Sequence, residues 1–347
     1  MTRLFLFNIE TDQHSKYLSS NCDFINSISN NFSQVSVYST HIGTFSPPKN
    51  VSLYELGGGT FFRRVKGVFR CFKILSEILQ DRNENVVLYH MVTGVPLLIS
   101  FPLAKLRVKQ AIWYSHSKSS LSLKLILRNV NLVFSPTNTS FPIKTSKLKI
   151  LGHGVNNKLF QYDSKSKRLG VITVGRVVPI KRIETFFYAL DRLDQNTRTL
   201  FSKFTIIGDT KADPEYVAQI LILAKKSNID LTIIDQIPRE KISTYLNGAN
   251  YYFMGTPNSL DKAALEAAMC GCILLNENLA NYKVFGIQDF FQINESTFNL
   301  IYAMEKMGGL NSVDLYNMQT HVANWNSTNN SIEVLTTNIS KALCNGE

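Results

Sequence analysis

The sequence predicts an α/β protein built from two Rossmann-like domains, and three observations predict it. The chain has 347 residues, which is too many for one ordinary core and suits two domains of about 150 residues. Short apolar runs alternate along it with segments of helical periodicity, as in parallel sheets covered by helices. These runs form two series, separated by a polar, lysine-rich stretch from Gln161 to Arg168. Because ligands of open α/β sheets bind beyond the carboxyl ends of the strands, we expect the site in a cleft between the domains.

The apolar runs are the expected strands. The first series comprises residues 4–7, 35–38, 86–89, 111–114 and 132–134. The second series comprises residues 171–174, 204–207, 231–234, 251–254 and 273–275. Helical patterns separate the strands, for instance at 183–190 and 216–224. The stretch 311–343 also has a helical pattern, with a possible break at Trp325–Thr328.

Composition and cysteine usage indicate a globular protein of a reducing compartment. Apolar residues make up 44% of the chain, and no window approaches the roughly 20 apolar residues of a membrane span. The first segment meets Glu10 and Asp12 too early for a signal peptide, so we expect a strand there. The five cysteines are scattered, and Cys270-Gly-Cys272 has the wrong spacing for a zinc knuckle or a redox motif. We therefore expect a cytoplasmic protein.

The net charge of +11 favours an anionic partner: a nucleic acid, an anionic membrane surface or a phosphorylated small molecule. The densest basic stretch alternates cations with large apolar residues at helical spacing, which suits a basic amphipathic helix lying on the inner face of a membrane. Its cations are Arg63, Arg64, Lys66, Arg70 and Lys73. A core helix with a basic outer face is an equal alternative. No nucleic-acid signature accompanies the stretch, so we expect no nucleic-acid partner.

The segment from Gly175 to Lys181 has the composition of a diphosphate site. It follows the expected strand 171–174, a glycine permits a tight exit, and Arg176 and Lys181 lie just before a helical pattern. Backbone N–H groups at a helix start attract anions, a guanidinium adds a forked donor set and an ammonium adds a point charge. A surface loop with two solvated cations is the alternative.

A second informative segment follows the expected strand 251–254. Glu266 is a carboxylate within an otherwise apolar helical pattern, and a buried carboxylate is costly unless it is paired or hydrogen-bonded. The pattern therefore leaves two interpretations open: a structural ion pair, or a carboxylate that accepts hydrogen bonds from ribose hydroxyls.

Together these segments resemble the C-terminal domain of glycosyltransferase family 4, in matching order and spacing. The resemblance rests on residues 175–181, 206–209, 245–250 and 265–271, and on residues 153–160 at the expected domain junction. It is clear from about residue 86 to residue 290.

The resemblance implies a GT-B fold, in which two Rossmann-like domains face each other across a cleft. It implies an N-terminal acceptor-side domain over 1–155, a linker over 156–168, a nucleotide-sugar domain over 169–318 and a C-terminal helix over 319–347 that packs back on the first domain. It also implies transfer of a sugar from a UDP- or GDP-sugar to a glycan or lipid-linked saccharide, with retention at the anomeric carbon and without a metal or other cofactor.

The resemblance also assigns roles. Arg176 and Lys181 would neutralise the donor diphosphate, and Glu266 would hold the ribose. His116, after the expected strand 111–114, would position or hydrogen-bond the reacting sugar, and a structural histidine is the alternative. His116, Arg176 and Lys181 are thus the expected catalytic residues. The expected donor-binding residues are Gly175, Arg176, Lys181, Asn258, Ser259, Asp261, Lys262 and Glu266.

Two departures from the family pattern affect the sugar and acceptor contacts. Asn258 stands where the family has a first Glu, eight residues before the second. Either the contacts to the donor-sugar hydroxyls differ from those of the family, or Asp261 and Lys262 take them over. The loop after the first expected strand lacks the family's Gly-Gly pair. Its polar side chains either contact the acceptor or belong to a solvated loop. These side chains are Glu10, Asp12 and His14.

Two other classes of function stay open at this point. Asn258 is compatible with a catalytically inactive GT-B-fold binding or scaffold protein. A nucleotide-sugar epimerase of similar architecture is the second alternative, and the Gly154-Val155-Asn156 element disfavours it.

Overall fold

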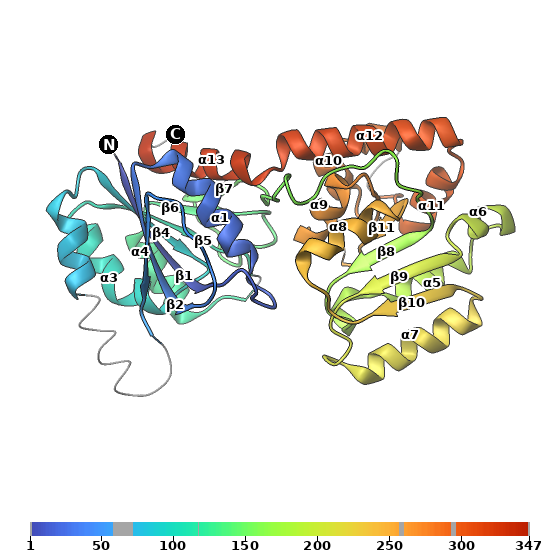
Figure 1. Cartoon of the computed structure of the whole chain (residues 1–347), viewed down its shortest axis with the longest axis horizontal. Coiled ribbons are helices and arrows are strands. Elements are labelled where there is room, and N and C mark those ends of the chain that lie inside the picture. The colour runs from blue at the N-terminus through green and yellow to red at the C-terminus, as the bar shows by residue number, and fades with distance from the viewer. Residues whose placement is uncertain (1, 58–71, 117, 257–259, 293–295, 346–347) are drawn as a thin grey trace. The chain divides into compact units, whose positions relative to one another are not determined.

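The computed structural model describes residues 2–57, 72–116, 118–256, 260–292 and 296–345. The chain divides into two compact units (Figure 1). The N-terminal unit comprises Met1–Gly154 and Ile332–Glu347, and the C-terminal unit comprises Val155–Ser331. No helix among the described residues is long and apolar enough to span a membrane.

The N-terminal unit contains a seven-stranded parallel sheet in the order β3-β2-β1-β4-β5-β6-β7. Its strands are β1 (Arg3–Thr11), β2 (Gln34–Ile42), β3 (Val51–Glu55), β4 (Asn85–His90), β5 (Lys109–Trp113), β6 (Leu132–Ser135) and β7 (Leu148–Ile150). Its helices are α1 (Ser20–Ile28), the short η1 (Ser29–Asn31), α3 (Gly94–Lys105), α4 (Leu121–Asn129) and α13 (Ile332–Asn345), and residues 72–80 are also helical.

Helices cover both faces of this sheet. Strand side chains alternate between the faces, so Leu4 and Leu6 join one core and Phe5 and Phe7 join the other. The first core includes apolar residues of α1 and α13. The second core includes apolar residues of helix 72–80, α3 and α4. Burial on both faces explains why these strands are continuous apolar runs in the sequence.

The C-terminal unit contains a five-stranded parallel sheet in the order β10-β9-β8-β11-β12. Its strands are β8 (Val171–Val174), β9 (Lys203–Ile207), β10 (Asp230–Ile234), β11 (Tyr251–Phe253) and β12 (Ile273–Leu275). Its helices are η2 (Pro179–Lys181), α5 (Glu184–Leu190), α6 (Gln195–Leu200), α7 (Pro214–Lys226), α8 (Arg239–Asn247), α9 (Lys262–Met269), α10 (Leu279–Val284), η3 (Gln288–Phe290), α11 (Leu300–Gly308) and α12 (Ser312–Asn329).

The strand order of the second sheet reverses at β8. The chain proceeds from β8 to β9 and β10 on one side, then returns to build β11 and β12 on the other side. The connections that follow β8 and β11 therefore lead to opposite sides of the strand order, and ligands of such sheets bind at this point. The site is expected between these two strand ends.

The C-terminal stretch of the chain divides between the two units. The stretch 319–347 is not one helix, because α12 ends at Asn329 in the C-terminal unit and α13 begins at Ile332 in the N-terminal unit. The buried Asn330 amide ends α12 by donating to the Asn326 Oδ1 atom (2.8 Å) and to the Val284 carbonyl oxygen (3.2 Å).

The stretch expected as a linker is fastened to the C-terminal unit. The Arg168 guanidinium donates to the carbonyl oxygens of Ala249 (3.1 Å) and Cys270 (2.6 Å). The Asp163 backbone N–H donates to the Asn247 Oδ1 atom at 2.8 Å. Charge and polarity along 156–168 therefore serve packing in this unit.

Candidate functional site

Three glycine-containing loops meet at the carboxyl edge of the second sheet. A Cβ atom at Gly208, after β9, would lie 1.8 Å from the carbonyl oxygen of Gly175, after β8. A Cβ atom at Gly255, after β11, would lie 2.3 Å from the carbonyl oxygen of Lys181. Only glycine fits at Gly208 and Gly255, and Gly208 also has a φ of +153°, which L side chains rarely adopt. The loops after the three central strands are thus held against one another by backbone contact.

Lys181, in the loop after β8, and Asp261, in the loop after β11, lie next to each other. Lys181 ends η2 and Asp261 is the residue before α9, and the Lys181 Nζ atom lies 2.5 Å from the Asp261 Oδ2 atom. About a quarter of each side chain remains exposed (26% and 22%), so solvent reaches the pair. An ammonium has three donors, and one carboxylate leaves capacity for a further anion.

Arg176 occupies a different setting in the same loop. Its side chain is exposed and, within the described part of the chain, has no hydrogen-bond or ion-pair partner. Arg182, directly after Lys181, pairs with Glu277 through its Nη1 atom at 2.6 Å. Of the two cations predicted for the diphosphate, the structure brings Lys181 to a carboxylate and leaves Arg176 in solvent.

Glu266 is buried on α9 and is paired with a cation that the sequence did not indicate. The Nη2 and Nε atoms of Arg239, the first residue of α8, lie 2.8 and 3.3 Å from its Oε1 atom. The side chains are 15% (Arg239) and 10% (Glu266) exposed, and the guanidinium lies 5.2 Å from the centroid of the Phe160 ring. The structural ion pair considered for Glu266 is therefore present.

The remaining donor-side predictions divide between described and undescribed residues. Asn258 and Ser259 lie outside the described residues. Lys262 is the first residue of α9 and is half-buried. The structure adds Asp209, which follows the Gly208 turn; this buried carboxylate accepts from the Lys211 backbone N–H at 3.1 Å.

The predicted residues of the N-terminal unit lie at the carboxyl edge of the first sheet. Glu10 and Asp12 lie at the end of β1, and His116 follows β5, which only β4 separates from β1. His116 is exposed, and its Nδ1 atom accepts from the Lys118 backbone N–H at 3.0 Å. His90, which ends β4 between them, stacks on Trp113 with ring centroids 6.2 Å apart; the sequence did not indicate this residue.

The loop after β1 is ordered by its own carboxylates. Asp12 accepts from the backbone N–H groups of His14 (2.9 Å) and Thr44 (3.2 Å). Glu10 accepts from the Ser15 hydroxyl at 2.6 Å. Ligand atoms of Glu10, Asp12 and His41 lie within 4.8 Å of one another, and exposed acidic groups commonly gather in this way without a metal.

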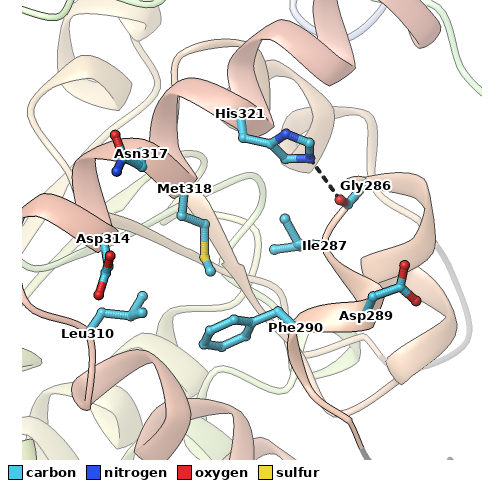
Figure 2. Close-up of a pocket in the computed structure, with 9 residues that line it drawn as sticks. All are labelled: Gly286, Ile287, Asp289, Phe290, Leu310, Asp314, Asn317, Met318 and His321. Carbon is cyan, nitrogen blue, oxygen red and sulfur yellow. Dashed lines mark hydrogen bonds between the residues drawn. The ribbon is translucent and has the colours of Figure 1, made fainter.

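A separate hollow lies on the C-terminal unit (Figure 2). It has a volume of about 450 Å³, and the His321 Nε2 atom lies 2.9 Å from the Gly286 carbonyl oxygen at its edge. It is lined by Gly286, Ile287, Asp289, Phe290, Leu310, Asp314, Asn317, Met318 and His321. None of the predicted site residues that the structure describes lines it.

Comparison with known proteins establishes the fold. No family model and no curated protein matches the chain. Solved structures do. The chain is 11% identical to Anabaena Alr3699/HepE in complex with UDP and glucose, over 99% of this chain and 100% of that one, with a TM-score of 0.64. It is 13% identical to a glycosyltransferase from Rickettsia africae (100% and 99% covered, TM-score 0.66). It is 12% identical to WaaG, a glycosyltransferase involved in lipopolysaccharide biosynthesis (98% and 99% covered, TM-score 0.60).

These neighbours are GT-B glycosyltransferases, and the chain shares their fold of two parallel-sheet α/β domains. The fold class predicted from the sequence is confirmed. At identities of 11–13% the likeness carries no residue-level assignment.

Proposed function

We propose that the chain is a retaining glycosyltransferase that moves a sugar from a nucleotide-diphosphate donor to a glycan or lipid-linked saccharide. The observation that carries the proposal is the Lys181–Asp261 pair, which joins the loops after β8 and β11 at the switch point of the second sheet. The Arg239-bound Glu266 lies on α9, the helix that begins directly after Asp261. The shared fold supports it, since the similar HepE structure is a complex with UDP and glucose.

In this proposal Lys181 and Arg176 act on the leaving group. The bond between the anomeric carbon and the donor phosphate oxygen breaks, and its electron pair goes to the diphosphate. The acceptor hydroxyl oxygen forms the new bond to that carbon, and its proton passes to the departing diphosphate. Cations held in place before the reaction stabilise the charge that develops on the diphosphate without having to reorganise. Asp261 holds the Lys181 ammonium in position for this role.

Glu266 is proposed to accept hydrogen bonds from the ribose hydroxyls. Its Oε1 atom accepts from the Nε and Nη2 atoms of Arg239, so that pair fixes the direction of the carboxylate before a ligand arrives. Asn258, Ser259, Asp261 and Lys262 are proposed for the donor sugar. His116 is proposed to position the reacting sugar, and Glu10, Asp12 and His14 to contact the acceptor.

The test is turnover with a panel of UDP-, GDP- and ADP-sugars, measured as donor hydrolysis and as transfer. Lys181→Ala should lower kcat/KM at least about 100-fold, as expected for loss of one charge-stabilising donor. Lys225→Ala is the matched control, because Lys225 is an exposed lysine on α7. Equal turnover of Lys181→Ala and Lys225→Ala would reject the site, and no turnover with any donor would reject the activity.

Membrane attachment through the basic stretch 61–73 stays a prediction. Arg63, Arg64, Lys66 and Arg70 lie outside the described residues, and Lys73 is exposed on the helix at 72–80.

A further inference from the structure

The positive charge of the chain is concentrated in one stretch, most of which belongs to the N-terminal unit. No Asp or Glu occurs between Glu84 and Asp163, whereas this stretch contains ten Lys and Arg residues. The whole chain has a net charge of +11, so nearly all of the excess arises here. The stretch includes α3 and α4, which lie outside the basic stretch 61–73.

Helix α3 exposes apolar side chains on its outer face. Leu97 (43%), Leu98 (53%) and Phe101 (58%) are exposed, and Lys105 continues the same stripe one turn after Phe101. Lys105 is the only charged residue of this helix, and its ammonium lies 5.5 Å from the centroid of the Phe101 ring. A helix that is apolar all round is normally buried, so this exposed face is unusual for a surface helix.

Helix α4 exposes a matching stripe. Leu121 (74%), Lys124, Leu125 (38%) and Arg128 are exposed at spacings of three and four residues, so they lie along one face. The opposite face is buried through Leu123 and Ile126. Two large apolar side chains thus alternate with two cations.

The two stripes belong to one surface. The Asn129 amide of α4 donates to the Ser100 hydroxyl of α3 at 3.0 Å, so the helices are neighbours. Their inward residues, which include Ile99 and Ile126, join the same core on one face of the sheet. Both outward stripes therefore point away from that sheet. We call the surface formed by Leu97, Leu98, Phe101, Lys105, Leu121, Lys124, Leu125 and Arg128 the α3–α4 face.

We propose that the α3–α4 face docks the protein on an anionic lipid membrane. Leucine and phenylalanine side chains entering the acyl boundary, with lysine and arginine at the headgroups, make the chemistry of an interfacial helix surface. A second copy of the chain would bring the same cations together and be repelled. A nucleic acid would satisfy the cations and leave the exposed leucines uncovered.

Binding of the full chain to vesicles tests this proposal, with neutral phosphatidylcholine compared against phosphatidylcholine containing phosphatidylglycerol. Lys124→Gln/Arg128→Gln should weaken binding to anionic vesicles about 25-fold, at about fivefold per cation. Leu97→Ser/Phe101→Ser should weaken it at least about tenfold, because less apolar area enters the bilayer. Wild-type affinity should fall steeply with salt.

A control variant distinguishes binding through the α3–α4 face from non-specific attraction by the positive charge of the whole chain. Ile222→Ser/Lys226→Gln alters an equally exposed apolar residue (67%) and a lysine on α7 of the other unit, and should retain wild-type binding. Equal loss in this control would overturn the proposal. So would wild-type affinity in both α3–α4 variants, with binding lost instead in Arg63→Gln/Arg64→Gln/Arg70→Gln.

Other occupants give distinct results. A wild-type dimer that Leu97→Ser/Phe101→Ser converts to a monomer in sedimentation velocity would identify a self-interface and overturn the proposal. Equal binding of wild type to neutral and anionic vesicles would also overturn it. Because the assay uses no nucleotide or sugar, its failure is distinguishable from failure of the proposed transferase activity. Unchanged thermal unfolding of each variant shows that lost binding is not lost folding.

Discussion

Replacing Arg239 with Met tests whether the Arg239–Glu266 pair is structural. Methionine preserves most of the length of the side chain against Phe160 and removes the charge. Breaking a fully buried pair by removing one partner costs about 3–5 kcal/mol, because a charge is left uncompensated. The side chains are 15% and 10% exposed, and water reaching them reduces the cost to about 2–3 kcal/mol. For a domain of this size each kcal/mol lowers Tm by about 2–4 °C, so we expect a fall of about 4–12 °C.

The assay is thermal unfolding of a double-mutant cycle. Glu266→Gln alone leaves the Arg239 cation unpaired and should also destabilise. Arg239→Met/Glu266→Gln removes both charges and should recover much of the loss, since a neutral pair has no uncompensated charge. Titration with UDP and GDP in the same variants asks whether the orientation of Glu266 matters for the ribose. Arg239→Met should weaken binding of the nucleotide that wild type binds, and should do so below the unfolding temperature.

Two results would refute the reasoning. A Tm of Arg239→Met within about 1 °C of wild type would mean that the pair behaves as a surface ion pair. Strict additivity of the two single variants would mean that Arg239 and Glu266 are not energetically coupled.

Two further predictions concern Asp261 in the C-terminal unit and one buried cysteine in each unit. Asp261→Asn removes one negative charge beside the site and retains a residue suited to the position before α9, so it should tighten binding of the nucleoside diphosphate about two- to fivefold at low salt. Weaker binding of both nucleotide and nucleotide-sugar would contradict this prediction. Weaker binding of the nucleotide-sugar alone would identify a contact between Asp261 and the sugar. Burial raises the pKa of the Cys22 and Cys272 thiols from 9.0 to about 12. Between pH 9 and 12 the folded protein keeps these thiol protons, whereas the unfolded chain loses them. The contribution of each thiol to the free energy of unfolding is therefore complete below pH 9 and is lost as the pH rises toward 12, at up to about 1.4 kcal/mol per pH unit. Denaturant titrations from pH 8 to 11 measure this, Cys272→Ala should flatten the slope, and a flat wild-type profile would contradict it.

Much of the fold follows from the sequence because buried parallel strands are continuous apolar runs. The expected strands at 171–174 and 273–275 coincide with β8 and β12. The edge strands β3 and β7 were not predicted. β3 is half-exposed, with polar residues among its apolar ones, and β7 has three residues with a lysine at its centre, so neither is a continuous apolar run.

The break between α12 and α13 was expected at residues 325–328 and lies instead between Asn329 and Ile332. It depends on the buried amides of Asn326 and Asn330, which accept and donate hydrogen bonds only in the folded unit. In the sequence both residues read as ordinary polar positions of a helix, so a local pattern cannot locate the break.

Local sequence predicted the charged residues of the candidate site but not their ion-pair partners. A glycine, two cations and a buried carboxylate indicate an anion site, but they do not indicate which cation is already neutralised. Lys181 and Glu266 each have an opposite charge within 2.8 Å, supplied by a residue 80 positions away in one case and 27 in the other. The charges within these two pairs cancel, whereas Arg176 is unpaired within the described part of the chain. In the proposed site Arg176 therefore supplies the uncompensated charge that attracts the diphosphate, while Lys181, held by Asp261, supplies a donor at a defined position. The two cations that look equivalent in the sequence are thus expected to differ in role, with Arg176 acting on binding and its salt dependence and Lys181 on the reacting geometry.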